Sequence, residues 1–303
     1  MRITSNMTAN NAIYNLQQGR SRLDKLQELS TTEQNINRPS DDPIAARILM
    51  DIGDKLKATD QYSSNITKAN TFMTVTNTAL TGISDFLAQA KSLVNSVSSG
   101  SNDATERQTV NDQLVALKKQ IIDMANTQSG DQYVFGGADS STPPFNTANN
   151  TYAGDGTQLQ IEVAQNSTQA MNLTGDRVLK GTGTSPSYGT TDILQTFDNL
   201  IAAVGDSTTP SNVTAIQQGA KDLETGAKQI ANAQSDLAAR MIRLENMTKM
   251  NTSNKNTLED IASNIQYVDL AKLGVQLTQQ QNAFSAALSA TAKISQMSLL
   301  DYL

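Results

Sequence analysis

The fold is decided near the C-terminus by residues 270–294, which read LAKLGVQLTQQQNAFSAALSATAKI. Apolar side chains return there every seven residues in two interleaved series, one through Leu277 and one through Leu273. These series are the a and d positions of a heptad, the pattern of a helix that packs on another helix along a narrow seam. A shorter stripe of the same kind lies near the N-terminus. Taken together, the stripe residues predicted to form an assembly interface are Ile13, Leu16, Leu23, Leu26, Leu270, Leu273, Leu277, Phe284, Leu288 and Ile294.

Neither terminal stripe is wide enough to form a stable core by itself. Isolated helices with narrow apolar faces are marginal in water, so both ends need partners. We expect residues 1 to about 40 and about 265 to 303 to become ordered when many copies pack side by side. The sequence therefore predicts a protein made for assembly rather than catalysis.

The composition excludes several kinds of chemistry. The 303 residues contain no Cys and no His, which removes Cys/His zinc sites, thiol catalysis and Ser-His-Asp triads. A net charge of −6 argues against a nucleic-acid partner. Residues 273–292 carry no charge, but their many Gln, Asn, Ser and Thr side chains argue against membrane insertion. We expect no enzymatic activity, no cofactor and no metal.

Long helical patterns flank the middle of the chain. A strict seven-residue series from Ile52 to Val94 predicts one helix of roughly 50 residues. The break at 98–103 precedes a shorter helix, and a second long pattern follows Pro210. Its phase is interrupted at Val268-Asp269, just before the terminal heptads.

The middle of the chain has a different character. Glycine and proline pairs mark turns there, and the apolar residues Leu159, Ile161 and Val163 alternate with polar ones as in a half-buried strand. A secreted enzyme that uses the carboxylates of this region is a remote alternative, because their positions show no acid/base spacing. These carboxylates are Asp131, Asp139, Asp155, Glu162 and Asp176.

The predicted fold class is mainly α. It is a long, antiparallel, coiled-coil-like helical bundle built from both halves of the chain, with a small all-β insertion domain in the middle. The predicted domains are terminal helices (1–42 plus 265–303), a helical rod (43–132 plus 190–264) and a β-rich outer domain (133–189).

A polar segment lies before the first long helix. Ser40 or Asp42 is suited to cap that helix, and Pro43 suits its first turn. Asp41 and Asp42 are expected to face the positive end of the helix dipole. A metal site is the other reading of this carboxylate pair, but no further ligands stand at suitable spacing. We therefore interpret Ser40, Asp41, Asp42 and Pro43 as a structural helix cap.

Three motifs resemble the bacterial flagellin superfamily. They are INRPSDDPIAA at 36–46, QYVFGG at 132–137 and QQQNAFSAAL at 279–288. Flagellins usually have Ala in place of Pro43 and usually end in a basic residue soon after the final Leu pair. The ending Asp301-Tyr302-Leu303 departs from that pattern and favours the hook–filament junction members of the superfamily.

The resemblance implies a function that spacing alone does not. Such proteins form a ring of copies between the hook-side junction protein (hook-associated protein 1) and flagellin, with their terminal helices in the inner tubes. They are extracellular, pass unfolded through the flagellar type III export channel without a cleaved signal, and are guarded by a cytoplasmic export chaperone. Flagellin itself, the filament subunit, is the alternative.

Overall fold

The computed structural model describes residues 5–98, 103–147, 149–182, 186–205 and 212–300; the side chains of 5–6, 8–9 and 294–300 are not described. The chain is mainly helical, which confirms the predicted fold class. Its helices are α1 (Ser5–Thr32), α2 (Pro43–Val97), α3 (Ala104–Ala125), α4 (Gly175–Val178), α5 (Ile193–Gly205), α6 (Val213–Gln266) and α7 (Leu270–Leu300). Its strands are β1 (Gln128–Ser129), β2 (Gln132–Tyr133), β3 (Gln160–Ala164) and β4 (Ser167–Ala170).

The chain divides into two compact units. The terminal unit comprises residues 1–58 and 253–303, and the central unit comprises residues 59–252. Both halves of the chain contribute to each unit. The long helices α2 and α6 each begin in one unit and end in the other.

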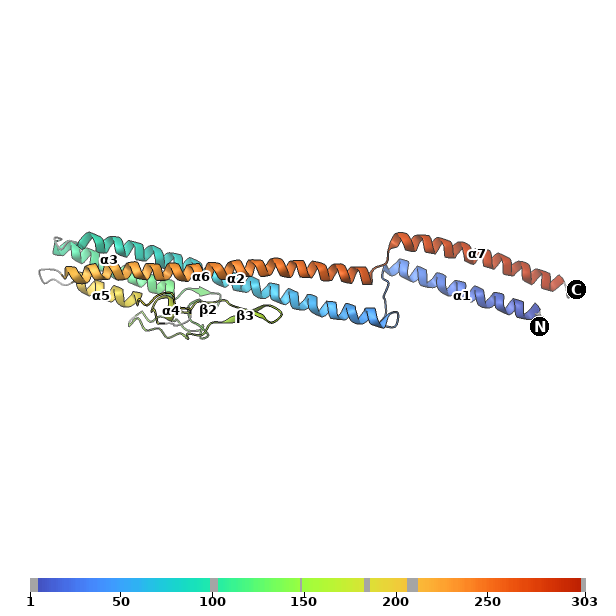
Figure 1. Cartoon of the computed structure of the whole chain (residues 1–303), viewed down its shortest axis with the longest axis horizontal. Coiled ribbons are helices and arrows are strands. Elements are labelled where there is room, and N and C mark those ends of the chain that lie inside the picture. The colour runs from blue at the N-terminus through green and yellow to red at the C-terminus, as the bar shows by residue number, and fades with distance from the viewer. Residues whose placement is uncertain (1–4, 99–102, 148, 183–185, 206–211, 301–303) are drawn as a thin grey trace. The chain divides into compact units, whose positions relative to one another are not determined.

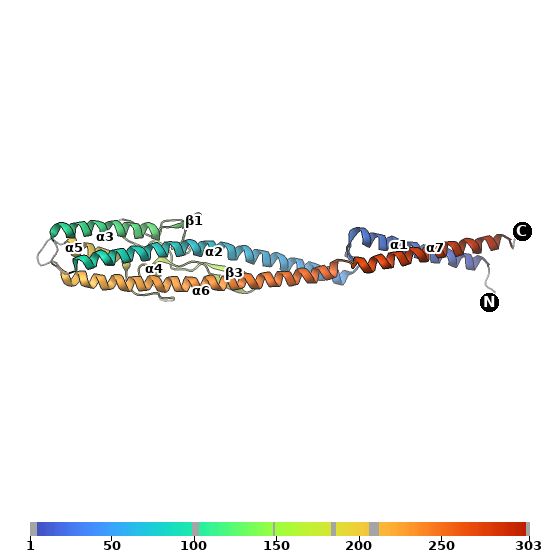
Figure 2. The same cartoon turned by 90° about the horizontal axis from the view of Figure 1, so that it is seen from above.

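Within the terminal unit, α1 and α7 lie side by side and run in opposite directions (Figures 1 and 2). Leu273 is buried, and the seam residues that follow it on α7 at three- and four-residue intervals are half-buried. Leu270, which the heptads also place in the seam, is exposed. From Leu273 on, the α7 seam follows the heptads: Leu273, Leu277, Gln280, Phe284, Ala287 and Thr291.

A short two-stranded joint follows α1 and precedes α7. Gln34 and Tyr267 form an isolated antiparallel bridge. The N–H of Asn35 donates to the carbonyl of Gln266 at 2.7 Å, and the N–H of Val268 donates to the carbonyl of Glu33 at 3.1 Å. The predicted interruption at Val268-Asp269 is confirmed, because α6 ends at Gln266 and α7 begins at Leu270.

The core of the central unit is formed by α2, α3, α5 and α6. The seven-residue series of α2 is buried along its length: Ile66, Met73, Leu80, Leu87 and Val94. It joins one apolar cluster with Leu114 of α3, Phe197 of α5 and Leu237 of α6. The period of the apolar residues thus decided which face of each helix turns inward.

The insertion between α3 and α5 contains two small antiparallel sheets, β1–β2 and β3–β4. The strand predicted at 159–163 corresponds to β3, in which Val163 is fully buried. Phe135, Val163 and Leu179 of the insertion belong to the same apolar cluster as the helices. The insertion and the helices therefore form one packed unit, and Figures 1 and 2 show β3 alongside α6.

Candidate assembly surface

The predicted interface residues lie on two different faces of the terminal helix pair. One group is half-buried or buried within the terminal unit: Leu16, Leu23, Leu26, Leu273, Leu277 and Phe284. The other group points to solvent: Ile13 is 51% exposed, Leu270 52% and Leu288 55%. Ile294 lies in α7, but its side chain is outside the described residues. The inner group can hold α1 on α7, and the outer group is free to contact other chains.

Exposed apolar side chains are concentrated in the terminal unit. Of the fourteen large hydrophobic residues that are exposed in the described part of the chain, eleven belong to this unit, although it has the smaller share of the residues. A concentration of exposed apolar side chains is expected of a surface that binds other proteins. These residues are Met7, Ile13, Tyr14, Ile44, Ile48, Met50, Ile261, Tyr267, Leu270, Val275 and Leu288.

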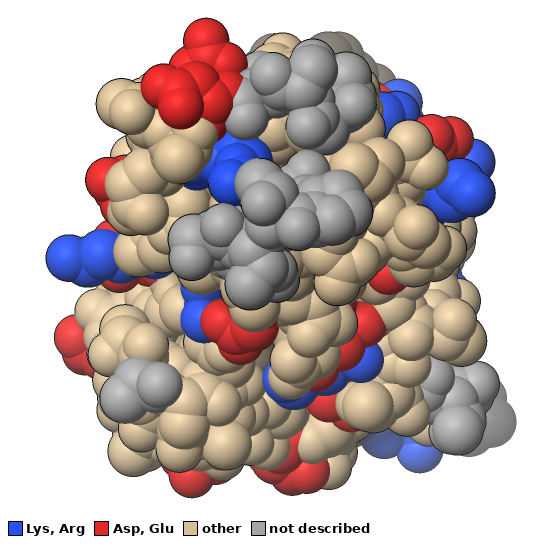
Figure 3. All heavy atoms as spheres, turned by 90° about the vertical axis from the view of Figure 1, so that its left-hand side faces the viewer, with Lys and Arg blue, Asp and Glu red and all other residues tan. Residues whose placement is uncertain are grey.

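The net charge, in contrast to the exposed apolar side chains, is concentrated in the central unit. The terminal unit contains 11 Lys and Arg residues and 11 Asp and Glu residues, so its net charge is zero. The central unit contains 12 basic and 18 acidic residues and carries the whole net charge of −6. Figure 3 looks onto one end of the central unit, where acidic and basic side chains are interspersed. Copies of the terminal unit can therefore approach one another without net repulsion.

Asp42 and Pro43 begin α2 in the way that the sequence predicts. Pro43 is the first residue of the helix. The Oδ1 atom of Asp42 accepts hydrogen bonds from the N–H groups of Ile44 at 3.0 Å and Ala45 at 2.9 Å. These N–H groups have no partner inside the helix, so the carboxylate satisfies donors that would otherwise need water.

Asp41 has a different place from the one expected. Its Oδ2 atom accepts hydrogen bonds from the N–H groups of Asn37 and Arg38, at 3.2 Å and 3.0 Å, in the turn that precedes α2. Its Oδ1 atom accepts from the Lys25 ammonium at 3.2 Å. The bond from Arg38 and the one from Lys25 lower the pKa of Asp41, and the same contact with Asp41 raises the pKa of Lys25. Asp41 therefore ties the turn back to α1 rather than facing the α2 dipole.

The rest of this turn adds one more link to α1. Glu28 lies 3.3 Å from Lys25 and 3.9 Å from the Arg38 guanidinium. Ser40 is exposed and makes no hydrogen bond within the described residues. Among the predicted cap residues, only Asp42 bonds the first N–H groups of the helix.

A row of polar side chains on α6 holds the insertion, and the periodicity of the sequence did not identify it. Gln229 donates to the carbonyls of Val178 and Thr191, at 2.9 Å and 3.0 Å. Further along the same face, Asn232 donates to Tyr188, Arg240 donates to Ala170 and Asn172, and Asn251 donates to Val163. We call Gln229, Asn232, Arg240 and Asn251 the α6 donor row. Apart from the Asp236 carboxylate that pairs with Arg240, every acceptor of the row is a main-chain carbonyl between α3 and α5.

Arg240 is also paired electrostatically. Its guanidinium lies 2.7 Å from Asp236, which accepts a 2.6 Å hydrogen bond from the Tyr188 hydroxyl. Burial, followed by this bond, raises the pKa of Tyr188. A signal for the row was present in the sequence, since polar residues interrupt the apolar face of α6, but periodicity alone does not identify their acceptors.

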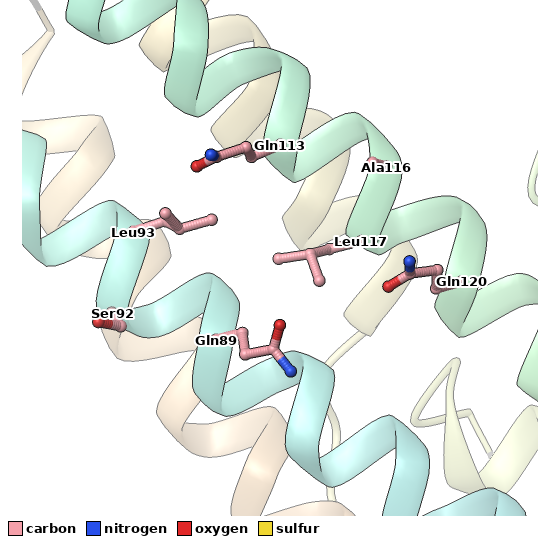
Figure 4. Close-up of a pocket in the computed structure, with 7 residues that line it drawn as sticks. All are labelled: Gln89, Ser92, Leu93, Gln113, Ala116, Leu117 and Gln120. Carbon is pink, nitrogen blue, oxygen red and sulfur yellow. The ribbon is translucent and has the colours of Figure 1, made fainter.

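The groove between α2 and α3 in the central unit has no charged side chain in its lining. It has a volume of about 440 Å³, with amides at its rim (Figure 4). Its lining consists of Gln89, Ser92, Leu93, Gln113, Ala116, Leu117 and Gln120. Within the described residues, no cluster of acidic side chains could hold a metal ion, and no helix is long and apolar enough to cross a membrane.

Known proteins share both the sequence pattern and the fold. Residues 3–139 match the family described as the bacterial flagellin N-terminal helical region. The chain is similar to members of the flagellin superfamily. Within it, the chain is similar to flagellar hook-associated protein 3 of Escherichia coli (strain K12), with 22% identity over 286 residues that cover 90% of each chain.

Two further relatives extend the comparison. Flagellin of Bacillus subtilis (strain 168) is 23% identical over 304 residues, which cover 98% of this chain and 97% of that protein. The solved structure of flagellar hook-associated protein 3 from Legionella pneumophila has a TM-score of 0.62 at 18% identity. It covers 71% of this chain and 98% of that chain, and the likeness concerns the fold.

Proposed function

We propose that the protein is a structural junction subunit of the bacterial flagellum, which joins the hook side to the flagellin filament. The observation that carries this proposal is the terminal unit, which is neutral, rich in exposed apolar side chains and built from both ends of the chain. The similarity to hook-associated protein 3 along 90% of the chain points to the same role.

The mechanism is geometric and involves no bond chemistry. The seam between α1 and α7 joins the two ends of the chain, and the outward residues Ile13, Leu270 and Leu288 contact neighbouring copies. Each such contact is small. In a closed ring every subunit makes it on two sides, so many weak contacts add up to a stable joint.

The partners follow from that position in the flagellum. They are other copies of the chain, the hook-side junction protein on one side and flagellin on the other. Before assembly, a cytoplasmic chaperone covers the apolar C-terminal helix, and the chain leaves the cell unfolded through the flagellar export channel. A chain without cysteine cannot form disulfide bonds during export.

Deleting the gene tests the proposal in the cell. We expect the deletion strain to keep intact hooks and to shed flagellin monomers into the medium, because the filament has nothing to grow on. Electron microscopy would show the hooks and immunoblotting the monomers. A deletion strain with normal filaments would refute the proposal, and one that secretes no flagellin at all would indicate an export role.

Flagellin itself is the second candidate, supported by the similarity to the Bacillus subtilis filament protein. Purified protein under salting-out conditions separates the two. A filament subunit grows long filaments under these conditions, whereas we expect this chain to form none.

A further inference from the structure

We infer that Gln280 is a register-determining residue, whose side-chain amide selects one alignment of α7 on α1. Its Nε2 atom donates to the main-chain carbonyl of Gly19 at 3.1 Å. Among the described residues, this is the only hydrogen bond that joins the two terminal helices. The inference concerns how the two ends pair and holds wherever in the cell the protein assembles.

The surroundings of Gly19 make this contact specific. Gln280 and Phe284 are four residues apart on α7, so they project from the same face of the helix. Gly19 lies against both: a Cβ atom added there would be 3.3 Å from Cδ2 of Phe284 and 3.9 Å from Nε2 of Gln280. Glycine inside a helix is unfavourable, and here it allows the close approach of the ring and the amide.

The apolar side chains of the seam alone would not define one alignment of α7 on α1. Because the apolar residues of α7 repeat every seven positions, a shift of seven residues again brings apolar residues onto α1. No ion pair among the described residues joins α1 to α7. In a shifted alignment the amide of Gln280 would leave Gly19 and lie against apolar side chains, which is costly. A single polar residue in a heptad seam is known to specify register in this way.

The Gln280 contact and the joint between Gln34 and Tyr267 specify the same alignment of α1 and α7. Gly19 is 15 residues before Gln34, and the midpoint between Gln280 and Phe284 is 15 residues after Tyr267. The bridge between Gln34 and Tyr267 and the bond between Gln280 and Gly19 therefore specify the same antiparallel alignment. They do so about 22 Å apart, at 1.5 Å per helical residue. The joint fixes one end of the pair, and Gln280 fixes its middle.

Engineered cysteines measure the alignment directly, because the natural chain has none. The in-register pair is Leu23→Cys with Leu277→Cys, and the pair shifted by one heptad is Leu23→Cys with Leu270→Cys. The readout is the effective concentration of each intramolecular disulfide in a thiol redox buffer, with the full-length chain. We expect the in-register pair to exceed the shifted pair by at least about tenfold, because one hydrogen bond contributes up to about that factor and the joint favours the same alignment.

Gln280→Leu tests the role of the amide. The ratio of in-register to shifted disulfide should fall by about tenfold, while the melting temperature stays the same or rises because the seam becomes more apolar. Gln279→Leu is the matched control: it makes the same substitution at an exposed neighbour and should leave the ratio unchanged. An unchanged ratio in Gln280→Leu, or an equal fall in the control, would overturn the inference.

Two further variants keep the test independent of added apolar surface. Gln280→Asn shortens the side chain, so its amide should no longer reach Gly19 and the ratio should fall. Gly19→Ala adds the crowded Cβ atom and should lower the ratio even though alanine favours helix. If both variants keep the wild-type ratio, Gln280 does not determine the register.

Discussion

Asp41 and Asp42 show how two adjacent carboxylates can have separate roles. Asp42 accepts from the first N–H groups of α2, and Asp41 accepts from the turn before it and from Lys25. The sequence identified Asp42 and Pro43 through the rules of helix capping. It could not place Asp41, because the position of that carboxylate depends on the path of residues 33–42, which local preferences do not specify.

The first prediction concerns the cap of α2. We expect Asp42→Ala to lower the free energy of unfolding by about 1 kcal/mol, the usual value for a lost capping side chain. Ser40→Ala is the control and should have almost no effect, since Ser40 caps nothing in the structure. Chemical denaturation measures both. A divalent ion that stabilises the wild type, but not Asp42→Ala, would show that the carboxylates bind metal.

The second prediction concerns pH. The pKa of Asp41 is lowered, so its contribution to the turn is complete above about pH 4, the ordinary range of a carboxyl, and is lost as the pH falls through the lowered value. The pKa of Lys25 is raised, so its contribution is complete below about pH 10.4 and is lost as the pH rises above that value. Proteolysis within residues 33–42 should thus be slowest between these limits. Lys25→Met should speed cleavage at neutral pH and remove the alkaline limit. Equal cleavage of the two proteins at pH 7 would contradict this.

At the level of elements, much of the helical architecture followed from the sequence. The seven-residue series predicted α2 and its buried face, and the terminal heptads predicted the seam of α7. In the insertion only β3 was foreseen, because two- to five-residue strands have little periodicity. The α6 donor row was missed because its acceptors are main-chain carbonyls far away in sequence, which no local pattern encodes.

The third prediction tests the seam. Phe284→Asp or Leu277→Asp should place a charge between α1 and α7 and destabilise the pair by about 2–4 kcal/mol. Motility should be lost while the central unit stays folded, as judged by the melting of its helices. Gln279→Asp, on the exposed side of α7, is the matched control and should remain motile. Motile seam mutants would refute the role of the seam, and a loss of secretion would point to export instead.

The fourth prediction tests the α6 donor row. Gln229→Ala should destabilise the central unit by about 1–3 kcal/mol, because it removes the partner of the buried Val178 carbonyl and of the half-buried main-chain groups of Thr191. Gln218→Ala on the same helix is the control, because that side chain is exposed and bonds only to Asp222. Thermal unfolding compares the two. Equal melting temperatures would show that the row does not hold the insertion.

At the scale of the whole molecule, the two units differ in how well they are packed. The central unit contains nearly all of the buried core, whereas Leu273 is the one fully buried hydrophobic residue of α1 and α7 within the described side chains. Local opening is easiest where few apolar side chains are buried. Assembly is thus expected to complete the packing that the free chain lacks.

The fifth prediction follows from that difference. Limited proteolysis of the free monomer should first remove segments within residues 1–40 and 265–303 and leave a resistant central fragment. Mass spectrometry identifies the fragments, and the same digestion of assembled protein should spare the ends. If the ends and the centre of a verified monomer were cut at equal rates, the terminal helices would be as stable as the core.

The α6 donor row also affects how the protein can evolve. Its amide and guanidinium groups bind carbonyls, which every amino acid possesses, so attachment of the insertion places little demand on the identity of the attached residues. Mutations of the exposed side chains at positions such as Gln160 or Glu162 can accumulate while the main chain stays attached. Substitutions can thus change the exposed surface of the insertion without loosening its attachment to α6.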